Sequence, residues 1–192
     1  MNNTKFLNDL GKAYQKAAAG RRQLSDFANQ AQALAKQAIF AAQRDNLVEA
    51  NTLLKKSEGF FTNGKAVLKK VEEIEYLGSW RAALEEYVEA KLFVSYLETK
   101  KIVPVTGYKI PTDVYLGAIS DLLGELARYA VKQATGGDKK TIKILVEVAT
   151  ATVGELAAMN LTGSLRSKFD QAKQHLRKLE DIQYDLSLRR HD

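Results

Sequence analysis

Apolar residues recur every three or four positions along most of the chain, which is the spacing of one helix face. The pattern is strongest from about residue 24 to residue 44. Its apolar members are Leu24, Phe27, Ala28, Ala31, Leu34, Ala35, Ala38, Ile39 and Ala42. Residues 4–19 predict an earlier helix, and Gly20 is either a break or a glycine tolerated within one longer helix.

A further helix is predicted from about residue 47 to Val71. Either Asp45 or Asn46 can cap its first turn, because both side chains accept hydrogen bonds from free backbone N–H groups. Gly59 and Gly64 weaken the prediction that this helix is continuous. Around residues 76–79 we expect the chain to turn into the next helix.

The most apolar predicted helix spans residues 80–99 and contains no helix-breaking residue. At about 100° per residue, its apolar side chains cover most of the circumference. The remaining polar sector contains Lys91, Ser95 and Glu98. We therefore expect this helix to be buried on several sides and the rest of the chain to be organised around it.

Two acids interrupt the apolar surface of this central helix. Glu86 and Glu89 project between Ala82 on one side and Phe93 and Tyr96 on the other. An unpaired carboxylate is costly in such surroundings, and two buried like charges need a compensating partner. A divalent cation is one partner that satisfies both carboxylates.

Two prolines place residues 102–111 in a loop, because proline lacks a backbone donor and restricts the residue before it. Thr112 can cap a helix over residues 113–133, which the glycine pair at 136–137 ends. Asp138 can cap the next helix, which is predicted to reach about residue 159.

The last helix is predicted to begin at Thr162 or Ser164 and carries a four-three repeat on an otherwise charged surface. The repeat consists of Leu165, Phe169, Ala172, Leu176, Leu179, Gln183 and Leu186. This seam, with the nearly all-apolar central helix, is more apolar surface than one small bundle easily buries. We therefore expect a closed homo-oligomer, although the seam can also pack within its own subunit.

These elements predict an all-α protein, an elongated antiparallel bundle of six or seven helices. The chain has only two prolines, and no segment shows the alternation of a strand. With 192 residues and 45% apolar content, we expect one globular domain over residues 1–192.

Composition narrows the function further. The absence of cysteine excludes disulfide frameworks, zinc–thiolate sites and thiol nucleophiles. The N-terminus is polar, and no stretch approaches about 18 consecutive apolar residues, so we expect a soluble, cytoplasmic protein that does not enter a membrane. A net charge of +6 favours a polyanionic partner such as nucleic acid, although many basic proteins bind none.

Four acids are the candidate metal ligands. Glu86 and Glu89 are three residues apart, and Asp121 and Glu125 are four apart, so each pair lies on one helix face. Four carboxylates on two facing helices can bind Mg²⁺ or Mn²⁺ through oxygen. Acids at these spacings are also common as solvated faces or salt bridges, and Asp121 and Glu125 lie away from the main apolar stripe of their helix.

Other candidate chemistry is sparse. The only histidines are His175 and His191, which we expect to be solvated. The sequence therefore offers almost no candidate residues for histidine-based catalysis. Residues 136–140 lack the spacing of a phosphate-binding loop and predict a turn. Candidate contacts to nucleic acid are Arg21, Arg22, Arg81, Lys139 and Lys140.

Short motifs in a fixed order follow from Trp80 onward. Trp80-Arg81, Ser-Tyr-Leu-Glu-Thr at 95–99, Ser-Leu-Arg-Ser-Lys-Phe-Asp at 164–170 and Tyr-Asp-Leu-Ser-Leu-Arg at 184–189 look like translin. Glu-Glu-Tyr-Val-Glu-Ala at 85–90 and Asp-Leu-Leu-Gly-Glu-Leu-Ala-Arg at 121–128 look like translin-associated factor X (TRAX), the related nuclease subunit. The chain therefore resembles the translin/TRAX family, specifically after Trp80 and more weakly before it.

The resemblance implies a subunit of seven helices with a translin-like α-α superhelix, which assembles into a hollow octamer around single-stranded RNA or DNA. In TRAX-like subunits, acids on two neighbouring helices hold Mg²⁺ and cut RNA endonucleolytically. The matching residues here are Glu86, Glu89, Asp121 and Glu125. Translin has non-acidic residues at the first two positions, so the resemblance favours the catalytic type.

The chain departs from translin just before Trp80, where residues 75–79 replace a basic, histidine-containing segment and leave only Arg81. Some RNA contacts must therefore lie elsewhere. The sequence predicts an Mg²⁺-dependent endoribonuclease acting on single-stranded RNA. The competing hypotheses are a non-catalytic single-stranded nucleic-acid-binding protein of the translin type and a helical scaffold whose acids are structural.

Overall fold

The computed structural model describes residues 3–71 and 77–188, and all the regular structure in these ranges is α-helical. The helices are α1 (Asn3–Gln43), α2 (Leu47–Leu68), α3 (Gly78–Thr99), α4 (Thr112–Thr135), α5 (Lys139–Ala158) and α6 (Gly163–Leu188). The all-α prediction is confirmed. The described part has six helices because α1 continues through Gly20 without a break. Residue 76 of the expected turn at 76–79, and His191, lie outside the described ranges.

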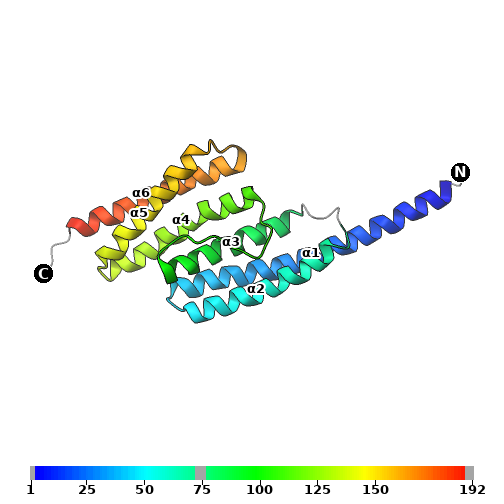
Figure 1. The fold of residues 1–192 in the computed structure, drawn as a ribbon, viewed down its shortest axis with the longest axis horizontal. Helices are drawn as coiled ribbons and strands as arrows, with labels where there is room; N and C mark the ends of the chain where they lie inside the picture. Colours follow the sequence, from blue (N-terminus) through cyan, green and yellow to red (C-terminus); the bar gives the residue numbers. More distant parts are fainter. Residues whose placement is uncertain (1–2, 72–76, 189–192) are drawn as a thin grey trace.

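The helices form an elongated bundle in which α1 and α2 pack together, α3 and α4 lie in the middle, and α5 and α6 form the opposite side (Figure 1). The two sides of the bundle are joined through its middle pair, because α3 packs on α1, α2 and α4, and α4 packs on α5 and α6. None of the helices described is long and apolar enough to cross a membrane.

One buried seam, mostly of alanine, lets α1 lie close to its neighbours. Its members are Leu24, Ala28, Ala31, Ala35, Ala38 and Ala42, all with no exposed surface. Alanine leaves room for a neighbouring helix to approach, and the buried hydroxyl of Ser57 on α2 donates to the Ala31 carbonyl at 2.9 Å. The helical spacing predicted for residues 24–44 is therefore confirmed.

Local signals fixed several helix ends as expected. The Asn46 side chain accepts from the Glu49 N–H at 3.1 Å, and Asp138 accepts from the Thr141 N–H at 2.9 Å, so both act as N-caps. Asn46, rather than Asp45, is thus the cap of α2. Thr112 is the first residue of α4 and not its cap, because the N-cap position belongs to Pro111.

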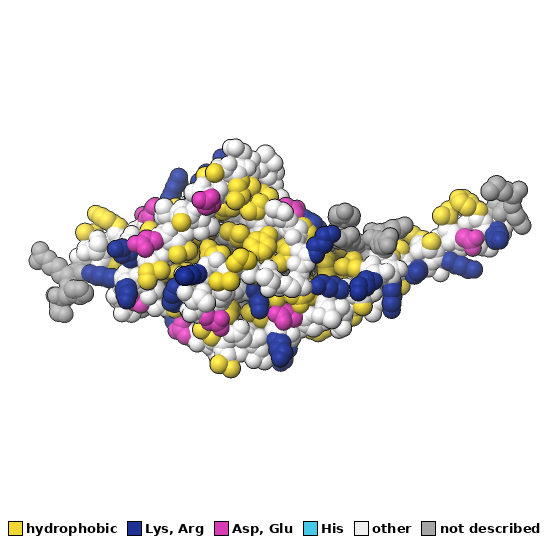
Figure 2. All heavy atoms as spheres, in the orientation of Figure 1, with side chains coloured by type: hydrophobic (Ala, Val, Ile, Leu, Met, Phe, Trp, Pro, Cys, Tyr) yellow, Lys and Arg dark blue, Asp and Glu magenta, His cyan; other side chains and the backbone are white. Residues whose placement is uncertain are grey.

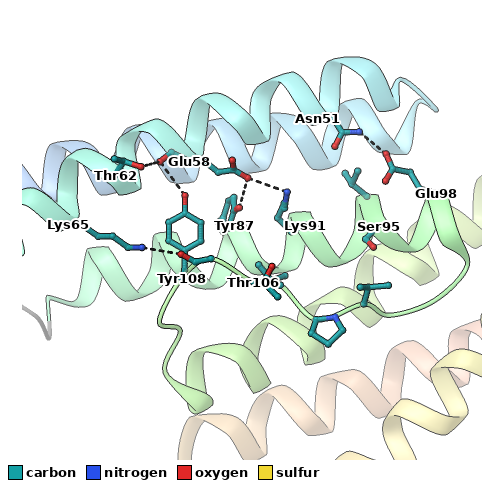
Figure 3. A pocket seen from close by; sticks show the side chains of 15 residues that line it. Asn51, Glu58, Thr62, Lys65, Tyr87, Lys91, Ser95, Glu98, Thr106 and Tyr108 are labelled. Carbon is teal, nitrogen blue, oxygen red and sulfur yellow. Dashed lines mark hydrogen bonds and ion pairs between the residues drawn. The ribbon is translucent and has the colours of Figure 1, made fainter.

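The antiparallel order fails between α3 and α4. Arg81 of α3 pairs with Asp113 of α4. Further toward the C-terminus of both helices, a Cβ on Gly117 of α4 would meet the Glu85 carboxylate of α3. The two helices therefore run parallel. The loop between them makes this possible because it returns along α3 before α4 begins (Figures 1 and 3).

The apolar seam of α6 is buried within the chain itself. Phe169, Ala172, Leu179 and Leu186 are buried, and α6 packs on α4 and α5. The seam therefore packs within its own subunit, which is the alternative that the sequence left open, so its burial does not require an oligomer. A different surface is exposed, because α1 projects beyond the bundle and residues 4–16 are all exposed (Figure 1). The homo-oligomer stays a prediction, and the number eight comes only from the family resemblance.

The packing of α2 against α3 depends on the absence of a side chain at Gly64. A Cβ at this buried position would overlap the Trp80 ring, whereas a Cβ on the exposed Gly59 of the same helix would meet nothing within 4 Å. We predict that Gly64→Ala lowers the free energy of unfolding by about 1–3 kcal/mol through overpacking. Gly59→Ala should instead raise it by about 0.5–1 kcal/mol.

Urea unfolding measures both changes, and the emission of Trp80, the single tryptophan, reports on its surroundings. Gly64→Ala should shift this emission and Gly59→Ala should not. Equal stability of the two variants would show that the Trp80 ring moves aside without cost.

Candidate functional site

The parallel register of α3 and α4 brings the predicted acids together. Counted from the Arg81–Asp113 ion pair, Glu86 and Glu89 lie about one and two turns further along α3, and Asp121 and Glu125 lie about two and three turns further along α4. The charges of Asp121, Glu86 and Glu125 all act on Glu89. We call these four acids the acid cluster.

Glu89 is the buried member of the acid cluster, with only 9% of its surface exposed. Burial, followed by repulsion from Asp121, Glu86 and Glu125, raises its pKa to about 9. Burial also raises the pKa of Glu86, and the charge of Lys36 and a hydrogen bond with Gln32 oppose this rise. At neutral pH, Glu89 therefore carries a proton in the metal-free protein.

A polar stripe on α1 contacts the cluster from one side. Lys36 Nζ lies 3.7 Å from Glu86 Oε2. Gln43 is buried, and its amide nitrogen donates to the Glu125 carboxylate at 2.7 Å and to the Glu125 carbonyl at 2.9 Å. With Gln32, these residues follow one face of α1, so the helix with the alanine seam also positions two of the four acids.

Helix α6 contacts the cluster from the other side. Lys168 Nζ pairs with Asp121 and lies 3.2 Å from Glu85 Oε1. Burial would lower the pKa of Lys168, but its hydrogen bond to Asp121 and the charges of Asp121 and Glu85 raise it. Lys168 is therefore a cation, which neutralises part of the acidic charge.

His175 of α6 lies against the backbone of α4, between two acids of the cluster. A Cβ added to Gly124 would lie 3.1 Å from its Nε2 atom, so glycine gives the ring room for this approach. His175 was expected to be solvated but is half-buried. Burial and then the charge of Lys178 lower its pKa, although Asp121 and Glu125 act in the opposite direction. The imidazole is therefore largely neutral near pH 7.

The donor chemistry of the acid cluster suits a hard divalent cation, because carboxylates are the oxygen ligands that Mg²⁺ and Mn²⁺ prefer. The four acids are partly buried and repel one another, which also favours a positive partner. Among the residues that the structure describes, however, no three acids or histidines stand in position to hold an ion. Lys168 provides the positive charge next to Asp121 instead.

The predicted contacts to nucleic acid separate into near and distant groups. Arg81 lines a hollow of about 310 Å³ together with Glu85 and Lys168, and Lys168 pairs with Asp121 of the acid cluster. Arg21 and Arg22 lie about four turns before Lys36 on α1. Lys139 and Lys140 lie in the first turn of α5, past the end of α4, so the structure does not bring them to the cluster.

The surface shows where basic side chains gather. Lys and Arg side chains follow the projecting segment of α1 at intervals, and a patch of hydrophobic side chains occupies the middle of the same face (Figure 2). Lys5, Lys12, Lys16, Arg21 and Arg22 all belong to the first part of α1, so these basic residues are separate from the cations around the acid cluster.

A larger groove of about 540 Å³ lies on the opposite face of α3, where the polar sector predicted at Lys91, Ser95 and Glu98 is found (Figure 3). Glu58 of α2 accepts from the Tyr87 hydroxyl at 2.7 Å and from Lys91 at 3.2 Å. These polar groups satisfy one another and hold α2, α3 and the returning loop together. The groove therefore has a structural role and is separate from the acid cluster.

Sequence reasoning missed the residues that surround the cluster, namely Gln32, Lys36, Gln43, Glu85, Arg128, Lys168 and His175. Most of them come from α1 and α6, whose placement depends on the whole fold. Arg128 had a local signal, because it follows Glu125 by three residues and its Nη1 lies 3.8 Å from Glu125 Oε2.

The model of the Translin family matches residues 19–190. Translin of Gallus gallus is 32% identical over 126 residues, which cover 57% of this chain and 55% of that protein. Translin of Homo sapiens gives the same identity and coverage. The chain thus spans about half the length of the curated relatives that it matches.

Solved structures with the same fold include apo-NeC3PO and AfC3PO in a complex with duplex RNA. The first has a TM-score of 0.84 and 23% identity, and covers 94% of this chain and 96% of its own. The second has a TM-score of 0.87 and 21% identity, with coverage of 95% and 96%. At these identities, the likeness establishes the fold.

The raised pKa of Glu89 predicts how stability depends on pH without metal. Since burial and its acidic neighbours raise this pKa from 4.5 to about 9, wild-type stability should fall as pH rises between these values. Glu89→Gln needs no proton, so it should be more stable than wild type by roughly 2–4 kcal/mol at pH 8. Near pH 5 the two should be almost equal.

Urea unfolding in EDTA at both pH values measures this difference. Glu98→Gln is the matched control, because Glu98 is exposed on the opposite face of the same helix. A stability difference for Glu89→Gln that does not change with pH would contradict the burial of a protonated carboxyl.

Proposed function

Because the chain belongs to the Translin family, we propose that it binds single-stranded RNA and cleaves it endonucleolytically in an Mg²⁺-dependent reaction. One observation carries this proposal: Glu86, Asp121 and Glu125 lie near enough to the buried Glu89 for their charges to raise its pKa. Cations border them on three helices, since Lys36, Arg128 and Lys168 each pair with an acid of the cluster.

In this proposal, Glu86, Glu89, Asp121 and Glu125 hold Mg²⁺, with Mn²⁺ as the alternative ion. When bound, the ion supplies Lewis-acid stabilisation of the negative charge on the scissile phosphate. Hydrolysis adds water across a phosphodiester bond, so one proton must leave the attacking water. A carboxylate of the cluster that is not fully engaged as a ligand is the base within reach.

The residues around the cluster keep its acids in place. Gln43 donates to both the side chain and the carbonyl of Glu125, which fixes the carboxylate relative to its own helix. Lys168 holds Asp121 from α6. Lys168 and Arg128 can also meet phosphate oxygens, because both remain partly exposed.

Single-stranded RNA is the proposed substrate, and single-stranded DNA is a second candidate ligand. The AfC3PO structure contains duplex RNA, so duplex RNA belongs in every binding test as a comparison. A single strand exposes its bases and bends easily, and both features favour its approach to an acidic site between helices.

A non-catalytic nucleic-acid-binding protein is the second candidate function. The observation that favours it is Lys168, whose contact with Asp121 neutralises the site without a metal. The curated relatives that match are also translins. The two candidates differ in one result, the cleavage of bound RNA after Mg²⁺ is added.

We predict that the purified protein cleaves end-labelled single-stranded RNA in Mg²⁺ or Mn²⁺ and leaves it intact in EDTA. Glu89→Gln should reduce the cleavage rate at least about 100-fold, because it removes a ligand charge from the cluster. Glu98→Gln should cleave at the wild-type rate. Gel analysis of products under single-turnover conditions measures all three proteins.

RNA binding without cleavage in wild type would favour the non-catalytic function. Undiminished cleavage by Glu89→Gln would remove Glu89 from the mechanism. Loss of cleavage in both variants would point to a general effect of changing α3.

RNA binding should survive removal of metal and weaken steeply with salt, because basic side chains that neutralise phosphates release counterions. Arg81→Glu should weaken binding and lower the slope of log affinity against log salt by about 0.7 per lost phosphate contact. Asp113→Asn is the matched control, because it breaks the same ion pair but leaves Arg81 free to meet phosphate.

Fluorescence anisotropy in EDTA, over a series of salt concentrations, measures the two slopes. Equal weakening by both variants would assign Arg81 to the α3–α4 ion pair alone. An affinity that does not change with salt would contradict a surface that follows phosphates.

A further inference from the structure

Phe40 is a large aromatic residue that the fold leaves uncovered next to the acid cluster. It is 48% exposed, whereas the apolar residues on the inner face of α1 are buried. It lies one turn after Lys36 and three residues before Gln43, the two α1 residues that contact Glu86 and Glu125. The exposed ring therefore belongs to the same face of α1 as the contacts to the acids.

Arg128 connects this ring to the cluster from α4. Its guanidinium carbon lies 4.8 Å from the centroid of the Phe40 ring, and its Nη1 lies 3.8 Å from Glu125 Oε2. The Arg128 side chain is 51% exposed, so both partners present surface to solvent. The guanidinium thus lies over one side of the Phe40 ring, and the pair stands at the edge of the acids.

We propose that Phe40 and Arg128 form a base-stacking subsite for the nucleotide next to the scissile phosphate. Unpaired bases stack on aromatic rings and on guanidinium planes, with little dependence on which base is present. A base and its phosphate are separated by one sugar, so a base on Phe40 places a neighbouring phosphate towards Glu125. The subsite rests on the proposed function, because it positions the same RNA.

This subsite also gives the site a means to select single strands. The bases of a duplex are stacked on one another and paired, so they cannot lie on Phe40 without opening the helix. An unpaired base pays no such cost. Phe40 should therefore contribute to the affinity for single-stranded RNA and little to the affinity for duplex RNA.

The test compares binding of two oligomers by fluorescence anisotropy in EDTA, where no cleavage occurs. One is a single-stranded RNA, and the other has the same length and backbone but no bases. Phe40→Leu should weaken binding of the RNA about tenfold and leave binding of the abasic oligomer unchanged. Phe40→Trp should retain the wild-type affinity for RNA, because it keeps a stacking surface.

Tyr184→Leu is the matched control, because it also changes an exposed aromatic residue to leucine. Tyr184 is 63% exposed and lies on the side of α6 opposite Lys168 and His175. Its affinity for both oligomers should equal that of wild type.

Several results would overturn the subsite. If Phe40→Leu binds RNA as wild type does, Phe40 takes no part in binding, while the proposed function stands. If it loses affinity equally for RNA and the abasic oligomer, its role is structural and not stacking. If the wild-type protein itself binds no RNA, both the subsite and the proposed function fail, and the RNA-binding measurement alone distinguishes this outcome from the first.

Discussion

The burial of α3 is the constraint on which the rest of the structure depends. This helix is covered by α1, α2 and α4, and twelve of its residues are buried. Such close enclosure needs small residues opposite it, which the alanine seam of α1 and Gly64 of α2 provide. Because the enclosing helices are fixed by apolar packing, they hold Glu89 at a position where its carboxyl is costly to ionise.

The surroundings of Glu89 show how the fold manages this cost. Protonation removes the charge of Glu89, whereas Lys36, Arg128 and Lys168 compensate the more exposed acids. The parallel course of α3 and α4 makes both arrangements necessary, because it aligns the acids of the two helices instead of separating them. The returning loop, which Tyr108 and Lys65 hold against α2, therefore determines the geometry of the acid cluster from the other side of α3.

Local patterns predicted the elements well and their long-range packing poorly. The helix face of residues 24–44, the cap at Asp138 and the burial of α3 on several sides follow from spacing and short-range hydrogen bonds, so the sequence sufficed, and it limited the cap of α2 to Asp45 or Asn46. The uninterrupted passage through Gly20 and the role of Gly64 depend on neighbouring helices. The four-three repeat of α6 indicated a packing seam correctly but could not say that α4 and α5 cover it.

The acid cluster was predictable only in part, for the same reason. Glu86 and Glu89 stood out because they are charged residues on an otherwise apolar helix face, and this unusual pattern is visible in the sequence. Lys36, Lys168 and Phe40 do not depart from the pattern of their own helices, since a lysine or an exposed aromatic residue is ordinary on a surface. Their roles arise only when packing places them beside carboxylates. A site of this kind is therefore detected in sequence by the residues that packing disfavours, and completed in structure by residues that look unremarkable.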